Sequence, residues 1–146
     1  MVVTSAVALE LHGHRGARGL VAENTLNSFR EALRYSVNCI ELDVGMSLDG
    51  HIVIHHDRAL NPDIARIGGE WIIAPLLLQD LTLAEIKMFD VSRIRPGTRY
   101  AAKYPKQNRI DAATVPTLEE MLAMPELVAK RDICLNIEIK TSPEAP

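Results

Sequence analysis

The segment CIELDVGMSLDGHIVIHHD, residues 39–57, carries the clearest fold signal in the chain. It opens with polar residues that alternate with apolar ones, as in a strand with one buried face. Because successive side chains of a strand point to opposite faces, Glu41 and Asp43 share a face and lie roughly 7 Å apart by the strand rise. Charge on a buried face is costly, so these two carboxylates require a compensating partner.

Predicted strands and helices alternate on both sides of this segment. Strands are expected over residues 8–13, 39–44, 51–57 and 132–140. Helices are expected within residues 23–37, 81–91 and 116–124, with Asn24 or Thr25 as the first N-cap and the capping-box pairs Thr82–Glu85 and Thr117–Glu120 in the other two. This alternation is typical of a parallel sheet covered by helices. The less regular residues 58–115 are expected to form a small inserted subdomain.

The overall composition excludes several classes of protein. A length of 146 residues suits one domain, and 47% apolar with 24% charged residues indicates neither disorder nor a membrane protein. A net charge of −3 and only 4% aromatic residues argue against nucleic-acid binding. Cys39 and Cys134 both fall in predicted strands and are interpreted as small buried apolar residues, because two cysteines make no disulfide framework.

The sequence also bears on the location of the protein in the cell. No apolar run is long enough to span a bilayer. The N-terminus, MVVTSAVALE, lacks the basic segment and long apolar core of a secretory signal, so we expect a cytoplasmic protein. Ala6, Val7 and Ala8 would serve as a cleavage site in a longer precursor, and a periplasmic location is expected in that case.

Polar residues gather at the carboxyl ends of the four predicted strands. They are His14 with Arg15, Glu41 with Asp43, His56 with Asp57, and Glu138 with Lys140. Ligands of parallel α/β folds bind at that edge of the sheet. The four clusters therefore predict one functional site.

Three of these side chains are hard oxygen ligands. Glu41, Asp43 and Glu138 suit Mg²⁺ or Ca²⁺, and such an ion would compensate the paired carboxylates of the opening segment. The alternative is a solvated cluster that pairs with Arg15 or Lys140 and binds no metal. Two fixed cations beside a metal indicate an anionic substrate, for which phosphate is the first candidate.

His14 and His56 form the natural pair for proton transfer, since imidazole titrates near neutral pH. The alternative is a structural role for each. His51 and His55 share a strand face that excludes His56, and we expect that face to point away from the site. His12 is likewise not expected to take part.

Four blocks of sequence, in order, resemble the glycerophosphodiester phosphodiesterases. They are HGHRGARGLVAENTLNSF, IELDVGMSLDGHIVIHHDRAL, VPTLEEML and NIEIK, so the resemblance extends from Leu11 to Lys140. It implies an α/β fold of the (β/α)₈ TIM-barrel type with a small insertion after strand three. Residues 1–146 would form the N-terminal half of that barrel, with about its first four strands and with residues 58–115 as the insertion.

The resemblance also implies an enzyme and roles for its residues. The reaction is the metal-dependent hydrolysis of glycerophosphodiesters to sn-glycerol 3-phosphate and an alcohol. The acid–base pair would be His14 and His56, the Ca²⁺ or Mg²⁺ ligands Glu41, Asp43 and Glu138, and the phosphate ligands Arg15 and Lys140. Glu23 and Asn24 match the ENT sequence of the family and would support the loop after strand one.

The length of the chain limits what the resemblance implies. A barrel of this type needs about 250 residues, and the chain has 146. Half a barrel exposes two strand edges, so the chain is expected either to self-associate through these edges or to belong to a longer protein. Two alternatives stay open: an inactive half-barrel that only binds metal or phosphate, and a phosphodiesterase that cleaves lysophospholipids.

Overall fold

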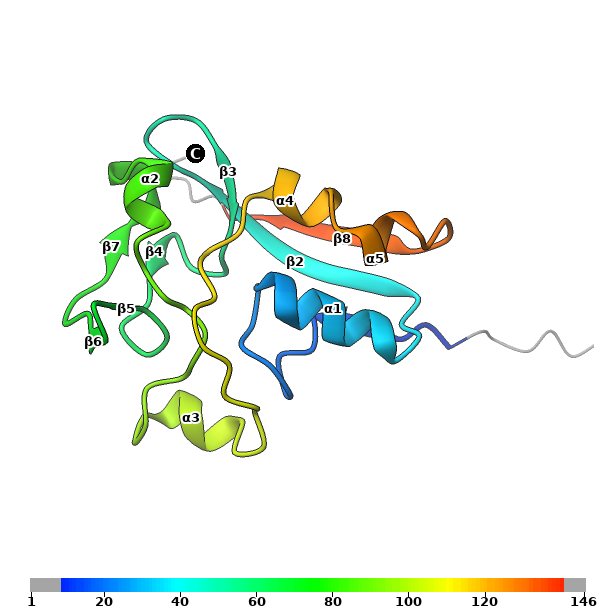
Figure 1. Cartoon of the computed structure of the whole chain (residues 1–146), viewed down its shortest axis with the longest axis horizontal. Helices are drawn as coiled ribbons and strands as arrows, with labels where there is room; N and C mark the ends of the chain where they lie inside the picture. The colour runs from blue at the N-terminus through cyan, green and yellow to red at the C-terminus, as the bar shows by residue number, and fades with distance from the viewer. Residues whose placement is uncertain (1–8, 141–146) are drawn as a thin grey trace, which may run out of the picture.

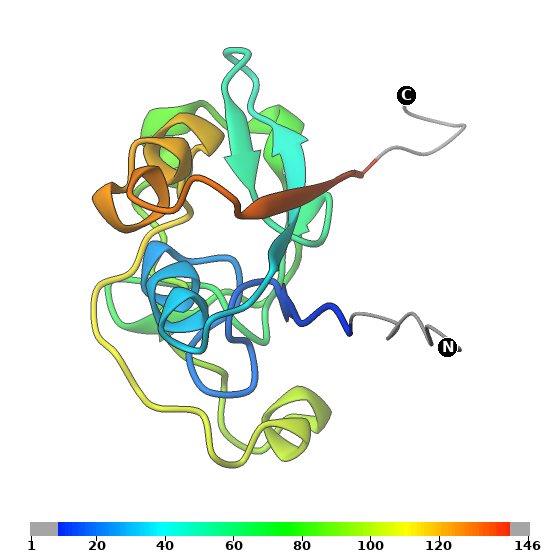
Figure 2. The same cartoon turned by 90° about the vertical axis from the view of Figure 1, so that its right-hand side faces the viewer.

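The centre of the fold is a four-stranded mixed sheet, seen from two directions in Figures 1 and 2. The computed structural model describes residues 9–140. In it β2 (Cys39–Met46) is the middle strand, and β1 (His12–His14) and β8 (Cys134–Ile139) run parallel to it. Glu41 pairs with His14 on one side and with Asn136 on the other. The predicted parallel arrangement of these three strands is therefore confirmed.

The strand β3 (Ile52–Ile54) runs antiparallel to the end of β2, so the prediction of four barrel strands is wrong for the third of them. The turn between the two strands is the reason. Ser47 Oγ donates to Asp49 Oδ1 at 2.7 Å and Gly50 has a φ of 83°, which together reverse the chain directly. A parallel connection needs about a dozen residues or more. The structure therefore holds three parallel strands, in an open sheet.

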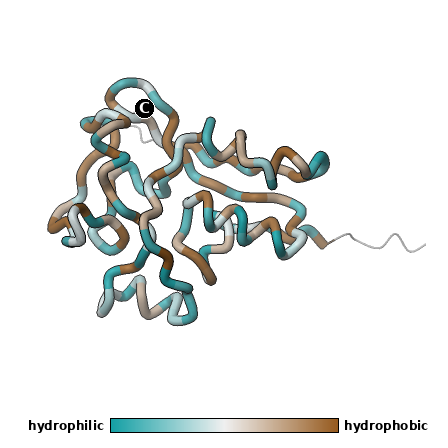
Figure 3. The backbone as a smooth tube through the Cα atoms, in the orientation of Figure 1, coloured by the Kyte–Doolittle hydropathy of each residue, from teal (hydrophilic) through white to brown (hydrophobic). Residues whose placement is uncertain are grey.

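One face of the sheet is covered by helices, as the alternating pattern predicts. They are α1 (Leu26–Arg34), α4 (Leu118–Leu122) and α5 (Pro125–Val128). Ile40 and Leu42 of β2 are buried against Phe29 of α1 and Met121 of α4. Figure 3 shows apolar and polar residues alternating along β2. Glu41 and Asp43 consequently lie on the face opposite the helices.

The helices begin where the sequence predicts caps. The Thr25 side chain accepts a hydrogen bond from the Ser28 backbone N–H, which selects Thr25 over Asn24 as the N-cap of α1. Complete capping boxes open α2 (Leu83–Ile86), through Thr82, and α4, through Thr117. The strand β1 starts at His12, later than predicted.

Residues 58–115, where the sequence predicts an inserted subdomain, contain only short elements. These are β4 (Ala59–Leu60) paired with β7 (Leu76–Leu77), β5 (Arg66–Ile67) paired with β6 (Glu70–Trp71), the 3₁₀ helix Leu78–Asp80, α2, and α3 (Arg99–Lys103). A second hydrophobic cluster, which includes Leu60, Leu78, Ile86 and Phe89, packs β4, the 3₁₀ helix and α2 together. Figure 1 shows this region beside the sheet, with α3 at its far end.

The N-terminal features fall partly outside the described residues. Ala8, where the first strand was expected to start, and the Ala6–Ala8 cleavage sequence both lie there. Within residues 9–140 no helix is long and apolar enough to cross a bilayer. The longest helix described, α1, has nine residues, whereas a membrane span needs about 20.

Gly16 fixes the loop that leads from β1 toward α1. Its φ is 78°, and a Cβ atom there would lie 2.7 Å from the Ser28 carbonyl carbon. We expect Gly16→Ala to lower the free energy of unfolding by about 1–3 kcal/mol or more, since left-handed strain of that size adds to the clash. Urea unfolding measures the change.

The matched control for Gly16→Ala is Gly19→Ala in the same loop. A Cβ atom on Gly19 would meet no atom within 4 Å. This variant is expected to unfold at nearly the urea concentration of the wild type. Equal destabilisation by the two changes would contradict the close approach of Gly16 to α1.

Candidate functional site

Three carboxylates from two neighbouring strands converge on one face of the sheet. Glu41 and Asp43 lie on β2, and the strand register places Glu138 of β8 opposite Asp43. One carboxylate oxygen from each residue lies within 4.8 Å of the other two. Asp43 is buried, Glu41 is half-buried and Glu138 is exposed. The parallel pairing of β2 with β8 therefore assembles the three predicted metal ligands.

Two cations lie beside Asp43, and one of them also contacts Glu138. Lys140 Nζ lies 2.9 Å from Asp43 Oδ1 and 2.5 Å from Glu138 Oε1, and Arg15 Nε lies 3.3 Å from Asp43 Oδ2. Burial alone would raise the pKa of Asp43, but hydrogen bonds donated by Asn24 and Lys140 outweigh it and hold that pKa below its usual value. Asp43 is therefore an ionised carboxylate at neutral pH.

The position of Arg15 is fixed by a strained loop. Its backbone N–H donates to Glu41 Oε2 at 2.8 Å, and its Nη1 donates to Glu23 Oε1 at 3.0 Å. Arg15 and Asn24 both have a φ of 52°, a left-handed conformation that is costly for residues other than glycine. Asn24 Nδ2 donates to Asp43 Oδ2 at 3.0 Å. The loop thus directs one cation and one amide toward the buried Asp43.

His14 adjoins the same network at the end of β1. Its Nε2 lies 3.6 Å from Glu41 Oε2, and its Nδ1 lies 3.0 Å from Nη2 of Arg18. Partial burial, together with the nearby Arg18 guanidinium, lowers the pKa of His14. The imidazole is therefore neutral at pH 7, and its half-exposed edge is open for contact with a ligand.

A cleft of about 280 Å³ opens beside Arg15. Its lining includes Arg15, His56 and Asp57 together with Tyr100, Lys103 and Tyr104 from α3 and the residue after it. His56 Nδ1 lies 2.7 Å from Asp57 Oδ1, and Asp57 Oδ2 accepts a hydrogen bond from Asn61 Nδ2 at 3.0 Å. Asp57 is thus held by Asn61 on one side, and on the other side it sets the orientation of the His56 ring in the cleft.

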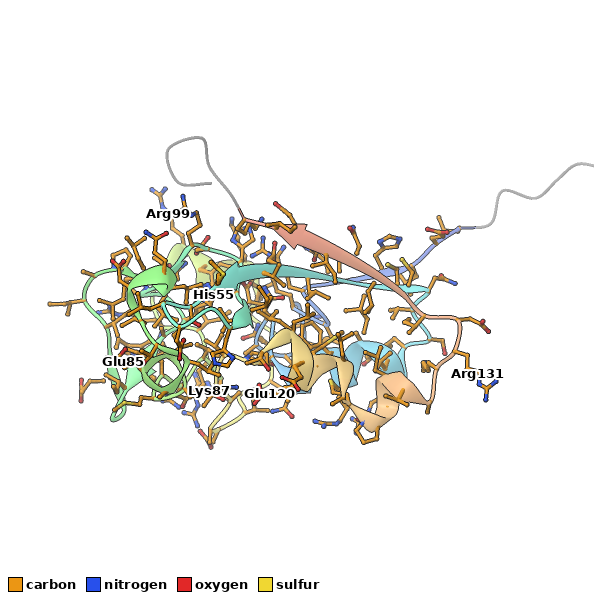
Figure 4. All side chains as sticks on the ribbon, turned by 90° about the horizontal axis from the view of Figure 1, so that it is seen from above. His55, Glu85, Lys87, Arg99, Glu120 and Arg131 are labelled. Atoms are coloured by element: carbon orange, nitrogen blue, oxygen red, sulfur yellow. The ribbon has the colours of Figure 1, made fainter. Side chains whose placement is uncertain are left out.

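His55 and His51 take no part in the cleft. His55 is buried, and its Nδ1 lies 2.9 Å from the carbonyl oxygen of Asp57. Figure 4 shows His55 in the interior of the molecule, whereas Arg131 extends outward. His51 is exposed and lies 3.9 Å from Asp49. His55 therefore supports the turn that carries His56, and burial lowers the pKa of its imidazole.

The structure brings six of the seven predicted site residues together in one network of polar contacts. These six are His14, Arg15, Glu41, Asp43, Glu138 and Lys140. His56 is paired with Asp57 instead and is linked to the others through the cleft that it shares with Arg15. The predicted pairing of the acidic cluster with Arg15 and Lys140 is present, and the three carboxylate oxygens lie close enough together to hold a metal ion.

The α3 region and Arg18 also adjoin the site, and neither was predicted from the sequence. The Arg18 guanidinium lies 5.1 Å from the centre of the Tyr104 ring, and the rings of Tyr100 and Tyr104 meet edge to face at 5.2 Å. The second arginine of the sequence HRGARG was the available signal for Arg18. No local pattern could place Tyr104, because the approach of α3 to the loop after β1 is a tertiary contact.

Comparison with known proteins identifies the family. The sequence profile of the Glycerophosphoryl diester phosphodiesterase family matches residues 14–146. The chain belongs to this family. A glycerophosphodiester phosphodiesterase of Caldanaerobacter subterraneus is 34% identical over 128 residues, which cover 88% of this chain and 44% of that protein.

Solved structures of related phosphodiesterases share the fold. One from Silicibacter pomeroyi, assigned as a glycerophosphoryl diester phosphodiesterase, has a TM-score of 0.89 at 33% identity and covers 95% of this chain and 48% of that one. An Oleispira antarctica phosphodiesterase in complex with the product sn-glycerol-3-phosphate has a TM-score of 0.64 at 28% identity, with 93% and 46% covered. The chain thus spans about half the length of the relatives that it matches.

The carboxylates of this phosphodiesterase-family chain fit a divalent cation. Oxygen ligands lie 2.3–2.6 Å from Ca²⁺, so two ligands of one ion are at most about 5 Å apart. The observed spread of up to 4.8 Å between the three oxygens meets this condition. Mg²⁺, with ligands at about 2.0–2.1 Å, requires a closer approach. The Lys140 ammonium already lies between two of the carboxylates, which shows that the position favours positive charge.

Proposed function

We propose that this chain carries the catalytic residues of a metal-dependent phosphodiesterase that hydrolyses glycerophosphodiesters to sn-glycerol 3-phosphate and an alcohol. The observation that carries the proposal is the network of three carboxylates, two cations and His14 at the ends of β1, β2 and β8. Membership of the family supports the reaction class. The product complex of the Oleispira antarctica relative supports the substrate class.

Glu41, Asp43 and Glu138 would hold the cation, for which we propose Ca²⁺ or Mg²⁺. When bound, a divalent ion in such a site orients the attacking hydroxyl and neutralises charge that develops on the phosphoryl oxygens. Asn24 and Arg15 keep Asp43 ionised and in place.

Arg15 and Lys140 would bind the phosphate. Both carry permanent positive charge at neutral pH, and both lie within 3.3 Å of the buried Asp43. An anionic phosphodiester beside them gains charge-assisted hydrogen bonds. Because Arg15 also lines the cleft, a phosphate at Arg15 would have the remainder of the substrate in contact with His56.

His14 and His56 would supply the proton transfers. One imidazole accepts the proton of the glycerol 2-hydroxyl as that oxygen attacks phosphorus, and the other donates a proton to the departing alcohol oxygen. The resulting cyclic phosphate is opened by water with the two roles exchanged. Asp57 orients the His56 ring for this transfer through the 2.7 Å contact between its Oδ1 and His56 Nδ1.

The α3 region would contact the substrate in the cleft. We expect Tyr104→Ala to raise KM for glycerophosphocholine about tenfold, because an aromatic contact is worth up to about 1.5 kcal/mol and 1.4 kcal/mol is a factor of ten. The turnover number should change less, since Tyr104 lines the cleft but is not one of the network residues at the strand ends. Steady-state kinetics on a protein that carries the whole barrel measures both constants.

The matched control is Tyr35→Ala. Tyr35 is 56% exposed at the end of α1 and does not line the cleft. Its replacement should leave KM at the wild-type value. A similar rise of KM in both variants would contradict the assignment of the cleft to the substrate.

The proposal is tested by following release of glycerol 3-phosphate from glycerophosphocholine by this chain, in Ca²⁺, in Mg²⁺ and in EDTA. Release that depends on metal and is absent from Glu41→Ala supports the proposal and shows that these strands alone assemble a working site. A folded chain that binds the ion but releases nothing acts only as a binding half-barrel. Release that is unaffected by EDTA would overturn the role of the metal.

A further inference from the structure

The two cysteines form a cross-strand pair on β2 and β8. Cys39 and Cys134 lie directly opposite one another in the parallel register, and their sulfur atoms are 2.6 Å apart. Cys39 is buried, as the sequence predicts. Cys134 is exposed, contrary to prediction, because within residues 9–140 the strand β8 pairs only with β2 and its other edge is open.

The cysteine pair lies on the same face of the sheet as the carboxylates. Residue pairs on this face follow one another along the β2–β8 ladder as Cys39 with Cys134, Glu41 with Asn136, and Asp43 with Glu138. The cysteines form the first of these three pairs. Two of the predicted metal ligands, Asp43 and Glu138, form the third. The hydrogen-bond partners of the two sulfurs in the described part of the chain are the Ile40 carbonyl oxygen and each other, so the pair lies outside the ion-pair network of the site.

We infer that Cys39 and Cys134 form a reversible disulfide, a modification site that links β2 to β8. Adjacent strands lie about 4.7–4.9 Å apart, within the Cα separation of about 4.4–6.8 Å that disulfides span. The sulfur atoms already lie 2.6 Å apart, close to the length of about 2.05 Å of a disulfide bond. The inference rests on this strand pair and holds whether or not the proposed hydrolysis is correct.

The oxidant is a small-molecule disulfide such as oxidised glutathione. The exposed Cys134 loses its proton and its thiolate attacks one glutathione sulfur, which forms a mixed disulfide and releases one glutathione thiolate. Cys39 then loses its proton and attacks Cys134 Sγ, which forms the Cys39–Cys134 bond and releases the second glutathione thiolate. Both protons are taken up by the two released thiolates, and the protein gives two electrons to the oxidant.

The bond would hold the two strands that carry the site. It closes a loop between residues 95 positions apart, and cross-links over long loops restrict the unfolded chain strongly. We expect the oxidised chain to melt about 5–15 °C above the reduced chain. The register that sets Asp43 opposite Glu138 would then persist without the metal.

Peptide mapping after treatment with oxidised glutathione tests the inference. Trypsin cuts after Arg34, Arg58, Arg131 and Lys140, so the bond joins the peptides 35–58 and 132–140. We expect this linked peptide, the loss of both free thiols, and the higher melting temperature. Dithiothreitol should reverse all three.

Two variants control for cross-linking of unfolded or flexible chains. Cys134→Ser should yield no linked peptide. Cys134→Ser combined with Asn136→Cys moves the thiol to the next pair on the same face, where the diagonal distance to Cys39 exceeds the roughly 7 Å limit for a disulfide. This double variant should retain free thiols or carry glutathione.

Equal yields of linked peptide from the double variant and the wild type would overturn the inference, as would a wild-type product that carries only glutathione on Cys134.

Discussion

Glu138→Ala is expected to abolish metal-dependent turnover in a protein that carries the whole barrel, and Glu41→Ala to do the same. Each change removes one of the three proposed oxygen ligands, which lie within 4.8 Å of one another. A bound ion supplies several kcal/mol of transition-state stabilisation, so the loss should reach about a thousandfold or more. Glycerol 3-phosphate release at saturating Ca²⁺ measures the loss of turnover. Calorimetric titration of the variant with Ca²⁺ measures the loss of ion binding directly.

Glu70→Ala is the control for these two variants. Glu70 lies on the exposed strand β6, away from the carboxylate cluster. Its removal takes away the same charge and should leave turnover and ion binding unchanged. If Glu138→Ala kept wild-type turnover at saturating metal, Glu138 would not be a ligand and the metal assignment would fail.

His56→Ala is expected to lower the turnover number by about 10²–10⁴, the range that general acid–base catalysis contributes. His14→Ala should lower it by a similar factor, since the proposed reaction needs one proton acceptor and one proton donor. The melting temperature should stay close to that of the wild type in both variants, because neither side chain is buried. Single-turnover kinetics separates this loss from any change in binding.

The neighbouring histidines provide the controls. His51→Ala changes an exposed residue outside the cleft and should be neutral. His55→Ala should keep most of the turnover but melt at a lower temperature, because it empties a buried site beneath the turn that carries His56. Equal losses of turnover at His55 and His56 would contradict the separation of the two roles.

Much of this site could be predicted from local sequence. The alternation in residues 39–44 correctly places Glu41 and Asp43 on one face, because strand geometry alone determines it. The strand ends bring Glu138 and Lys140 to the same point because β8 is parallel to β2. The capping residues Thr82 and Thr117 could also be predicted from the sequence, since a capping box is a contact within four residues.

The features of the fold and the site that the sequence did not predict depend on tertiary contacts. The direction of β3 follows from a short turn that the sequence did show, but the barrel resemblance favoured a parallel strand at that position. The exposure of Cys134 follows from the open edge of β8, which no residue pattern encodes. The α3 residues of the cleft lie about 85 positions from Arg18 along the chain, so no local pattern of sequence could predict their approach.

The wide separation of β2 and β8 in the sequence has a kinetic consequence. The β2–β3 hairpin and the cluster within residues 58–115 form from nearby residues, whereas pairing of β2 with β8 must first close a loop of 95 positions. Non-local pairing of parallel strands is intrinsically slow. The carboxylate cluster should therefore appear late in refolding, after most helical structure, and until then one edge of β2 stays open to pairing with other chains.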